Sequence, residues 1–410
     1  LDVGLVASEP ILRRSINANL RLGRPQNAQR LAKFAIREAA PEAMRVEAIR
    51  SLAVWGTPPK LDRVEGRYRD LMNRPVEPIH DIFDQHIGDL LSSKSDDIRA
   101  ATAEAISKLN YGNAAVRLNR LALNNSLPAS LRASAVDALH SIDADGVDAV
   151  VTSGLKDKSA ILRAAAVRVL AKRSANSQQL IFAINEALKS TDFRERQNAL
   201  RILGSLKSSE AISLLEVQAQ QLIEGTASPL LQLDILEAAK ANKGGKLVQI
   251  ASDYHKAHAD RLLADRFPEM LEGGDPIVGE SIFRTSFTAQ CIRCHKVGQV
   301  GGDVGPNLNG LAERLDGRDM LESLLDPQAK IADGYGLITF TMKNGEIFTG
   351  SIDKKSANFL SIKDQSGTLS LIKTADIKRR SKSVSSMPPM MGILDPRGLR
   401  DLVAYMKTLK

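Results

Sequence analysis

The sequence predicts a mainly α-helical protein: an array of repeated helix pairs over residues 1–270, followed by a second domain over residues 276–410 with a β-rich insertion at about 336–380. Three observations support this prediction. An arginine-led pattern recurs along the first two thirds of the chain, an isolated cysteine and histidine motif begins at residue 291, and apolar residues alternate around an Asn-Gly turn at residue 344. A chain of 410 residues is also too long for a single compact core.

The composition is that of an ordinary globular protein. Hydrophobic residues make up 43% of the chain and aromatic residues only 4%, which favours helices built from Ala, Leu, Ile and Val over a large sandwich. The formal net charge is +8, but basic and acidic residues are interleaved and no aromatic residues accompany the basic ones, so nucleic acid is not an expected partner. The densest basic run, Lys378–Lys382, is expected to be a solvated loop or, alternatively, a contact for an acidic protein. No stretch approaches the roughly 18 apolar residues that span a membrane.

The recurring pattern consists of an arginine, a small or apolar residue three positions later and an apolar residue seven positions later. These offsets place the three side chains on one helix face. Copies follow one another about every 33 residues, which indicates stacked helix pairs. One longer interval contains Thr57-Pro58-Pro59 and Arg74-Pro75, which predict an extended connection. The copies are Arg13-Ile16-Leu20, Arg45-Ala48-Leu52, Arg99-Thr102-Ile106, Arg132-Ala135-Leu139, Arg163-Ala166-Leu170 and Arg196-Ala199-Leu203, with a last one, Gln232-Ile235-Ala239, that lacks the arginine.

This array resembles HEAT-type repeats, including the arginine near the start of the second helix of each pair. In that family the arginine is structural and pairs with an acidic residue in a neighbouring turn. The resemblance therefore implies a structural role for the arginines here, and a long curved surface suited to holding another protein or domain. No catalytic constellation stands out in this region, and surface or packing roles are expected for its scattered histidines. These are His80, His86, His140, His255 and His258.

The only cysteines of the chain, Cys291 and Cys294, stand three positions apart and are followed directly by His295. This is the attachment sequence of a c-type haem. One helical turn presents both sulfurs to the two vinyl groups of the porphyrin, and the next side chain offers its imidazole to the iron from the same side. Three other interpretations remain open: a dithiol redox pair, which needs only the two cysteines, a structural zinc site, which needs four ligands, and a strained disulfide.

The sequence on both sides of the Cys-x-x-Cys-His motif contains further features that bear on its interpretation. Gly279 and Phe283 lie on a helix predicted from Pro276 to Ala289, the loop Gly305-Pro306-Asn307-Leu308 follows, and Asp395 caps an amphipathic closing helix that begins at Pro396. Together these features resemble a monohaem class I cytochrome c. In that family the opening and closing helices cross at the glycine and the aromatic residues. The loop proline offers its carbonyl to the second nitrogen of the haem-ligating histidine, and matching positions imply this contact between Pro306 and His295.

The same resemblance implies a methionine as the second axial iron ligand. In the family it precedes the closing helix, often within a Met-Pro pair. Met387, which stands before Pro388, is the expected ligand, with Met390 and Met391 as alternatives. A further alternative is that all three pack over the haem edge and leave the iron open. A thioether ligand favours ferrous iron and a comparatively high potential, which suits one-electron transfer.

The segment between His295 and Met387 is longer than a small cytochrome requires and is rich in strands. Lys343-Asn344-Gly345 is a hairpin signal between two of them. With this insertion, residues 276–410 resemble the Pirellula/Verrucomicrobium-type haem-binding domain, which also shares the segment from Asp326 to Tyr335. Proteins of that kind often carry helical repeats directly before the haem domain, and the N-terminal propeller that some of them carry is not in this sequence. The predicted strands are Leu337–Met342, Glu346–Ile352, Phe359–Lys363 and Thr368–Lys373.

Three classes of function follow from these expectations. The first is a c-type cytochrome with one covalent haem c, which exchanges single electrons with a redox protein or dehydrogenase domain held by the helical array. The second is an enzyme: the cytochrome part of a larger dehydrogenase, or a peroxidase-like protein with open iron. The third is an interaction scaffold that the haem merely stabilises. Because this kind of haem attachment takes place outside the cytoplasm, the expected location is periplasmic or otherwise extracytoplasmic in a bacterium, with the signal segment absent from this sequence.

Overall fold

The computed structural model describes residues 1, 8–62, 64, 66–175, 177–243, 245–364 and 367–410. Most of the described residues lie in helices, which confirms the mainly α-helical class predicted from the sequence. The chain divides into two compact units, Leu1–Ile202 and Leu203–Lys410. Among the helices described, none combines the length and the apolar character that crossing a membrane requires.

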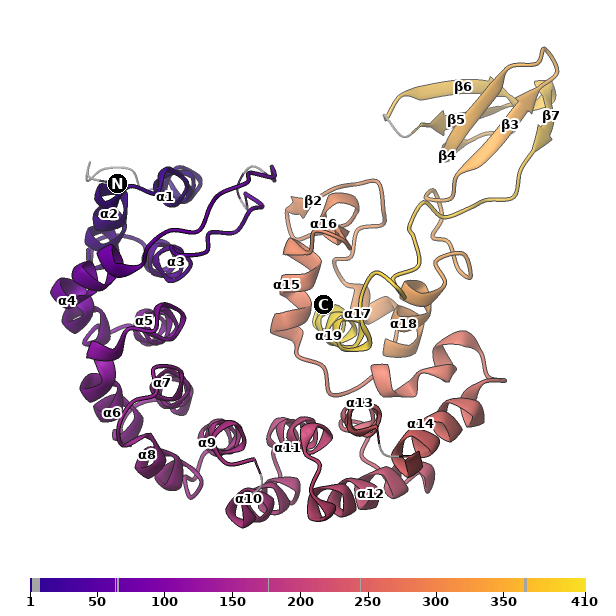
Figure 1. Cartoon of the computed structure of the whole chain (residues 1–410). Helices are drawn as coiled ribbons and strands as arrows, with labels where there is room; N and C mark the ends of the chain where they lie inside the picture. The colour runs from indigo at the N-terminus through magenta and orange to yellow at the C-terminus, as the bar shows by residue number, and fades with distance from the viewer. Residues whose placement is uncertain (2–7, 63, 65, 176, 244, 365–366) are drawn as a thin grey trace. The chain divides into compact units, whose positions relative to one another are not determined.

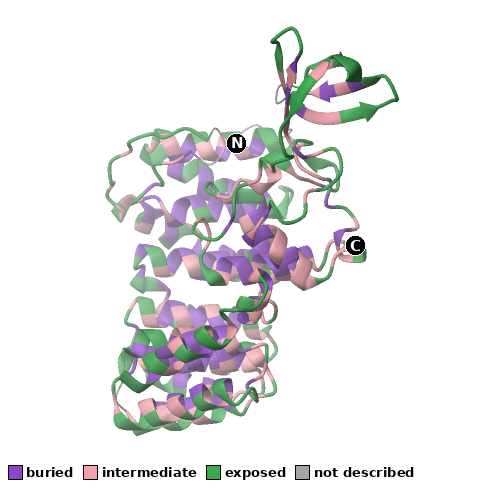
Figure 2. Cartoon of the chain, turned by 90° about the vertical axis from the view of Figure 1, so that its right-hand side faces the viewer, coloured by how far each residue is buried: buried purple, intermediate pink, exposed green. Residues whose placement is uncertain are grey.

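The first unit is a stack of helices in two layers (Figure 1). Its elements are α1 (Glu9–Leu22), α2 (Pro25–Ala35), α3 (Glu42–Ala53), α4 (Glu77–Leu91), α5 (Asp96–Leu109), η1 (Gly112–Ala114), α6 (Ala115–Leu123), α7 (Ala129–Ser141), α8 (Val147–Gly154), α9 (Ala160–Arg173) and α10 (Gln178–Leu188), while α11 (Phe193–Ser205) spans the boundary with the second unit. The odd-numbered helices carry the arginine pattern, and α3, α5, α7 and α9 pack on one another in succession. The middle residues of the pattern, such as Ile16, Ala48 and Ala135, are 0% exposed, so the small side chains predicted at these positions allow close packing. Figure 2 shows the buried residues mainly on helices, whereas the loops between the helices are largely exposed.

The arginines of the pattern join neighbouring elements. Arg132 forms a buried ion pair of 2.9 Å with Asp157, and Arg163 donates two hydrogen bonds, of 2.8 and 2.5 Å, to the carboxylate of Glu195. Arg45 instead donates to a backbone carbonyl at the end of α2, at 2.7 Å. These arginines therefore have the structural role that the sequence predicts, although the acceptor is not always a carboxylate.

The extended connection predicted by the proline-rich segments is confirmed, because the described residues between α3 and α4 contain no helix. The connection packs against the start of the array. Arg74 donates to the carbonyl of Leu20 at 2.7 Å, and its guanidinium carbon lies 5.0 Å from the centre of the Trp55 ring. Asp62, which is 1% exposed, accepts a hydrogen bond of 2.9 Å from Asn17. A segment without helix is thereby fixed by polar contacts to α1.

The second unit continues with further helices and contains the cysteine motif. Its helical elements and the first short strand pair are α12 (Ser209–Ile223), α13 (Gln232–Asn242), α14 (Gly245–His258), η2 (Leu263–Arg266), η3 (Pro268–Met270), α15 (Pro276–Thr285), α16 (Cys291–Cys294), β1 (Lys296–Val297), β2 (Val300–Gly301), α17 (Leu311–Arg314), α18 (Gly317–Leu325) and α19 (Pro396–Met406). Helices α12, α13 and α14 pack on one another, and α19 packs on α15 and α18. The predicted closing helix is confirmed at its start: Asp395 is the N-cap and accepts a hydrogen bond of 2.7 Å from the backbone N–H of Gly398. Leu399, Leu402, Val403 and Met406 are buried on its inner face, as the sequence predicts.

The β-rich insertion forms a five-stranded antiparallel sheet within the described residues. Its strands are β3 (Ile338–Met342), β4 (Ile347–Lys355), β5 (Phe359–Lys363), β6 (Leu369–Lys373) and β7 (Ile377–Arg380), with the turn η4 (Thr374–Asp376) before β7, and their order is β6-β5-β4-β3-β7. The predicted hairpin joins β3 to β4, and Gly345 provides the positive φ, 91°, that its turn requires. Phe340, Leu360 and Ile362 form the buried core of the sheet.

The last strand, β7, shows that the loop predicted for the basic run was partly wrong. The basic run Lys378–Lys382 was expected to be a loop, yet its first three residues belong to an edge strand that pairs with β3. These residues are exposed, and Ile377 is the residue of β7 that turns partly inward. An edge strand with one inward side chain has almost no alternation of apolar and polar residues, so the usual sequence signal of a strand is missing.

Candidate functional site

The cysteines lie at the two ends of α16, a helix of a single turn. Gln290, directly before it, adopts a left-handed conformation with φ 49°, and the turn closes through a hydrogen bond of 2.9 Å from the His295 N–H to the Cys291 carbonyl. Both cysteines are free thiols; Cys294 is exposed and Cys291 is partly buried, which raises the pKa of the Cys291 thiol. The turn therefore places two thiols and the following imidazole next to one another.

The His295 ring is held in one orientation by the loop that follows. Its Nδ1 lies 2.9 Å from the carbonyl oxygen of Pro306. A carbonyl only accepts hydrogen bonds, so Nδ1 carries the proton and Nε2 keeps its lone pair. Burial also lowers the pKa of His295 and favours the neutral ring. A neutral imidazole with a fixed tautomer is the form that binds a metal ion through Nε2.

Glycines let the loop approach this turn closely. The Gly305 N–H donates to the Cys294 carbonyl at 2.8 Å, and the Gly302 N–H donates to the Ile292 carbonyl at 3.0 Å. A Cβ on Gly305 would lie 2.7 Å from Cε1 of His295, and one on Gly302 would lie 2.0 Å from a backbone oxygen of α16. The sequence singled out Gly305 but not Gly302, whose only signal was its place in a pair of consecutive glycines.

Helices α15 and α19 cross at the residues that the sequence singled out. A Cβ on Gly279 would lie 1.9 Å from the backbone oxygen of Asp401, so only glycine allows this approach. The rings of Phe283 and Tyr405 lie beside the crossing, with centroids 5.6 Å apart. Helix α15 ends at Thr285, earlier than predicted, because the next residue, Ser286, is extended. The cysteine turn, α16, packs on α15, one of the two helices that cross here.

The three methionines have different surroundings. Met390 is 2% exposed and hydrogen-bonds through its N–H to the carbonyl of Leu324 at 2.8 Å. Met391 is 42% exposed and lines a separate pocket. Met387 is partly buried and, like Cys291, packs at the margin of the hydrophobic cluster that contains Phe283 and Met390. Among the three, Met387 combines a side chain near the surface of this cluster with a place next to the proline.

The donor set agrees with the requirements of a covalent haem. Two free thiols stand one turn apart, and the adjacent imidazole has its second nitrogen already occupied by Pro306. Within the described part of the chain, no group of three or more His, Cys, Asp or Glu side chains is arranged to hold a metal ion, so the zinc interpretation gains no further ligands there.

Comparisons with known proteins bear on the helical part of the chain. A family model described as HEAT repeats matches residues 149–221, and this confirms HEAT repeats over that segment. Among solved structures, human deoxyhypusine hydroxylase in complex with glycerol is similar at 17% identity and a TM-score of 0.25, over 60% of this chain and 93% of that chain. The comparison with curated proteins gave no match.

Proposed function

We propose that this protein is a monohaem c-type cytochrome that exchanges single electrons with a partner docked on its helical repeats. The observation that carries the proposal is the contact between His295 and Pro306, because it orients the imidazole that directly follows the two-cysteine turn. A dithiol redox pair has no use for a histidine fixed in this way. The contact therefore favours the haem over the dithiol.

Cysteine, histidine and methionine side chains would each hold the haem in a different way. Cys291 and Cys294 would each add a thiol S–H across a vinyl group of the porphyrin, and His295 would ligate the iron through Nε2. Met387 would supply a further ligand to the iron, with Met390 and Met391 as the alternatives. The haem, when bound, supplies the ferric–ferrous couple.

The protein around these ligands limits their movement. Pro306 fixes the tautomer of His295, and the loop backbone at Gly305 lies close to the ring, at a position where a Cβ would be 2.7 Å from it. Met387 is anchored through its backbone N–H, which donates to the Ser385 hydroxyl at 3.2 Å. Ligands held in both oxidation states keep the reorganisation on electron transfer small, which suits a relay without substrate chemistry of its own.

The partner and location follow from the same proposal. HEAT repeats support interaction with another protein, and a redox protein or a dehydrogenase domain is the partner that a haem relay requires. Covalent attachment of haem c outside the cytoplasm makes the location periplasmic or otherwise extracytoplasmic.

The decisive experiment is expression with a bacterial cytochrome c maturation system, followed by a pyridine haemochrome assay and haem staining after denaturing electrophoresis. We expect one covalent haem per chain, a pair of thioether bonds that is reduced to one in Cys291→Ala or Cys294→Ala, and no covalent haem in the double variant. His258→Ala, which removes a histidine far along the sequence from the motif, should keep full incorporation. Absence of covalent haem in the unaltered chain would overturn the proposal.

The axial ligand has its own test. We expect Met387→Ala to lose the long-wavelength absorption band of methionine-ligated ferric haem, whereas the matched variant Met391→Ala retains it. Carbon monoxide binding to the reduced, unaltered protein at neutral pH, with no such band in the oxidised form, would instead favour an open-iron enzyme.

A further inference from the structure

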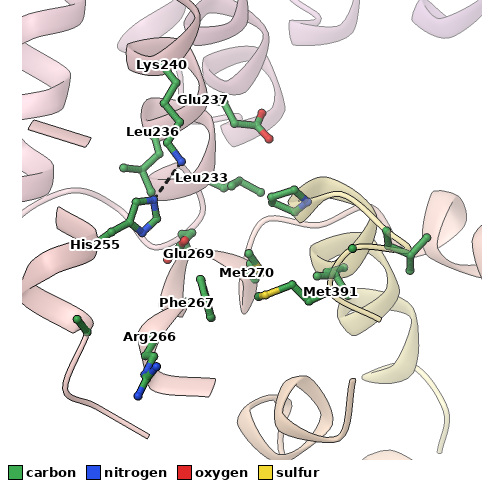
Figure 3. Close-up of a pocket in the computed structure, with 15 residues that line it drawn as sticks. Leu233, Leu236, Glu237, Lys240, His255, Arg266, Phe267, Glu269, Met270 and Met391 are labelled. Atoms are coloured by element: carbon green, nitrogen blue, oxygen red, sulfur yellow. Dashed lines mark hydrogen bonds between the residues drawn. The ribbon is translucent and has the colours of Figure 1, made fainter. Parts of the chain in front are cut away.

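The second unit contains a pocket of about 490 Å³ that the haem site does not use (Figure 3). Helices α13 and α14, the turn η3 and residues 391–399 form its walls. The volume lies in the range of about 300–1,000 Å³ that is typical of small-molecule sites. The walls are mostly apolar and include Leu233, Phe267, Met270 and Met391. A pocket of this kind selects a ligand that is largely apolar.

The polar groups of the pocket gather at one end. Figure 3 shows Lys240 reaching toward His255, with Glu269 beside them and Met270 and Met391 on the other side. The Lys240 ammonium donates to Nε2 of His255 at 3.0 Å. Nε2 is therefore an acceptor, and the proton of the neutral ring resides on Nδ1. Burial, followed by the charge of Lys240, lowers the pKa of His255 and keeps the ring neutral.

Glu269 adds a third polar group at this end. Its side chain is 1% exposed and accepts a hydrogen bond of 3.4 Å from the Tyr254 hydroxyl. Burial raises the pKa of Glu269 to about 7, so at slightly acidic pH its carboxyl is protonated and can donate a hydrogen bond. Lys240, His255 and protonated Glu269 together offer donors to a ligand.

The charges of the pocket point to an anionic head group. Glu237 is the other acidic residue in the walls, and it forms an ion pair of 2.5 Å with Arg397. Lys240 has no carboxylate within ion-pair distance among the described residues. Arg266 is a second cation at the margin, and its Nε donates to a backbone carbonyl. While Glu269 is protonated, the polar end therefore has positive charge that no described carboxylate within ion-pair distance neutralises.

We propose that this pocket binds an apolar monocarboxylate, whose carboxylate accepts hydrogen bonds from Lys240 and His255 and whose apolar body lies against Met270 and Met391. A charge-assisted hydrogen bond to Lys240 explains why a carboxylate is preferred to an alcohol of the same length. The site requires no haem, and Met391 is the one residue of its lining that also stands as an alternative haem ligand.

The test uses octanoate, octanol and octylamine as matched probes on the full chain with [13C]methyl-labelled methionine. We expect octanoate to shift the methyl signals of Met270 and Met391 and to leave that of Met320, a buried residue of α18, unchanged. Calorimetric affinity should be at least tenfold higher for octanoate than for octanol, and octylamine should bind more weakly than octanol. Equal affinities for the three probes, or no shifts with octanoate, would overturn the proposal.

Variants separate the roles of the polar groups. Lys240→Met keeps the length of the side chain without its charge, and we expect at least a tenfold loss of octanoate affinity with little change for octanol. Lys256→Met is the control, because Lys256 lies on α14, is exposed and pairs only loosely, at 3.5 Å, with Asp253. An unchanged octanoate affinity in Lys240→Met would contradict the proposal.

The pH dependence supplies a readout that a merely structural pocket would not give. As the pH rises from 6.5 to 8, Glu269 ionises and repels the bound carboxylate, so octanoate affinity should fall severalfold. Tyr254, Lys240 and His255 face the same carboxyl, and none of them gains negative charge in this interval. Glu269→Gln should make the affinity independent of pH, and a wild-type affinity that rises with pH would count against this arrangement.

Discussion

At the scale of single residues, His295 is constrained from two directions by groups that act differently. The Pro306 carbonyl fixes which ring nitrogen carries the proton, whereas Gly305 leaves room for the ring by having no side chain. The first effect is electronic and the second is steric. They can therefore be separated by mutation.

Replacement of Gly305 by alanine tests the steric effect. Because the new Cβ would lie 2.7 Å from the imidazole, the ring or the loop must shift, and we expect a loss of about 1–3 kcal/mol in the free energy of unfolding of the second unit. Gly245→Ala, at a position with no heavy atom within 4 Å, serves as the control and should be neutral or slightly stabilising. Chemical denaturation of both variants checks this prediction, and equal effects would refute it.

The buried carboxyl of Glu269 gives a prediction about pH. Its pKa is raised from 4.5 to about 7 in the folded state, so the stability it contributes is complete below about pH 4.5 and is lost as the pH rises toward 7. The loss should be on the order of 3 kcal/mol. The Glu269→Gln variant should lack this pH-dependent part of the free energy of unfolding. Urea unfolding between pH 5 and 8, followed through the Met270 methyl signal, measures it.

Sequence reasoning found one residue cluster and missed another, for a physical reason. Cys291, Cys294 and His295 lie within five consecutive positions, so their spacing alone predicts that they act together. Lys240, His255 and Glu269 come together only through the packing of α13, α14 and η3. The sequence assigned His255 to surface or packing roles because no second ligand stood nearby in the chain.

At the scale of elements, α13 and α19 are joined by a buried ion network. Asp234 is 0% exposed; it accepts a hydrogen bond of 2.7 Å from Arg400 and forms an ion pair of 2.8 Å with Arg397. A carboxylate removed from water is tolerated only while its partners remain. The network therefore connects the closing helix, α19, to α13, the helix of the last repeat, which lacks the arginine. This contact is additional to the crossing of α19 with α15.

Arg400→Met tests this network. We expect a loss of about 3 kcal/mol in the stability of the second unit, because a buried charge keeps only one of its two partners. Arg284→Met removes an exposed pair with Glu280, one turn away on α15, and should cost less than about 0.5 kcal/mol. The double variant Asp234→Leu/Arg400→Leu should recover part of the loss. A loss in Arg400→Met no larger than in Arg284→Met would show that the network is not stabilising.

Some helices and strands could be predicted from patterns in the sequence and others could not. The helices were predictable because their apolar residues repeat with helical spacing and the copies recur about every 33 residues. The hairpin was predictable from its Asn-Gly turn. Strand β7 was not, because its pairing with β3 is a tertiary event and its side chains are almost all exposed cations.

At the scale of the whole molecule, the two compact units contain different spectroscopic probes. Trp55, the only tryptophan of the chain, is 2% exposed and belongs to Leu1–Ile202. All residues proposed to hold the haem belong to Leu203–Lys410. Tryptophan fluorescence therefore reports the unit that does not contain the haem site.

This separation gives a prediction for haem-loaded protein. A covalent haem would be ligated and packed against the protein only when the second unit is folded, and these contacts would stabilise that unit. We expect Cys291→Ser/Cys294→Ser to lower the melting temperature seen through the Met320 methyl signal by several degrees, while the fluorescence transition of Trp55 changes by less than about 1 °C. A common shift of both signals would mean that the units unfold together.

The two outer strands of the β-sheet differ in a way that affects how the protein must be handled. Strand β7 presents Lys378, Arg379 and Arg380 at one margin, and such charges discourage another chain from adding a strand there. Strand β6, at the opposite margin, exposes Leu369 by 59% and Leu371 by 71%. Self-association in concentrated solution should therefore begin at β6, and a single lysine in place of Leu371 should suppress the resulting turbidity.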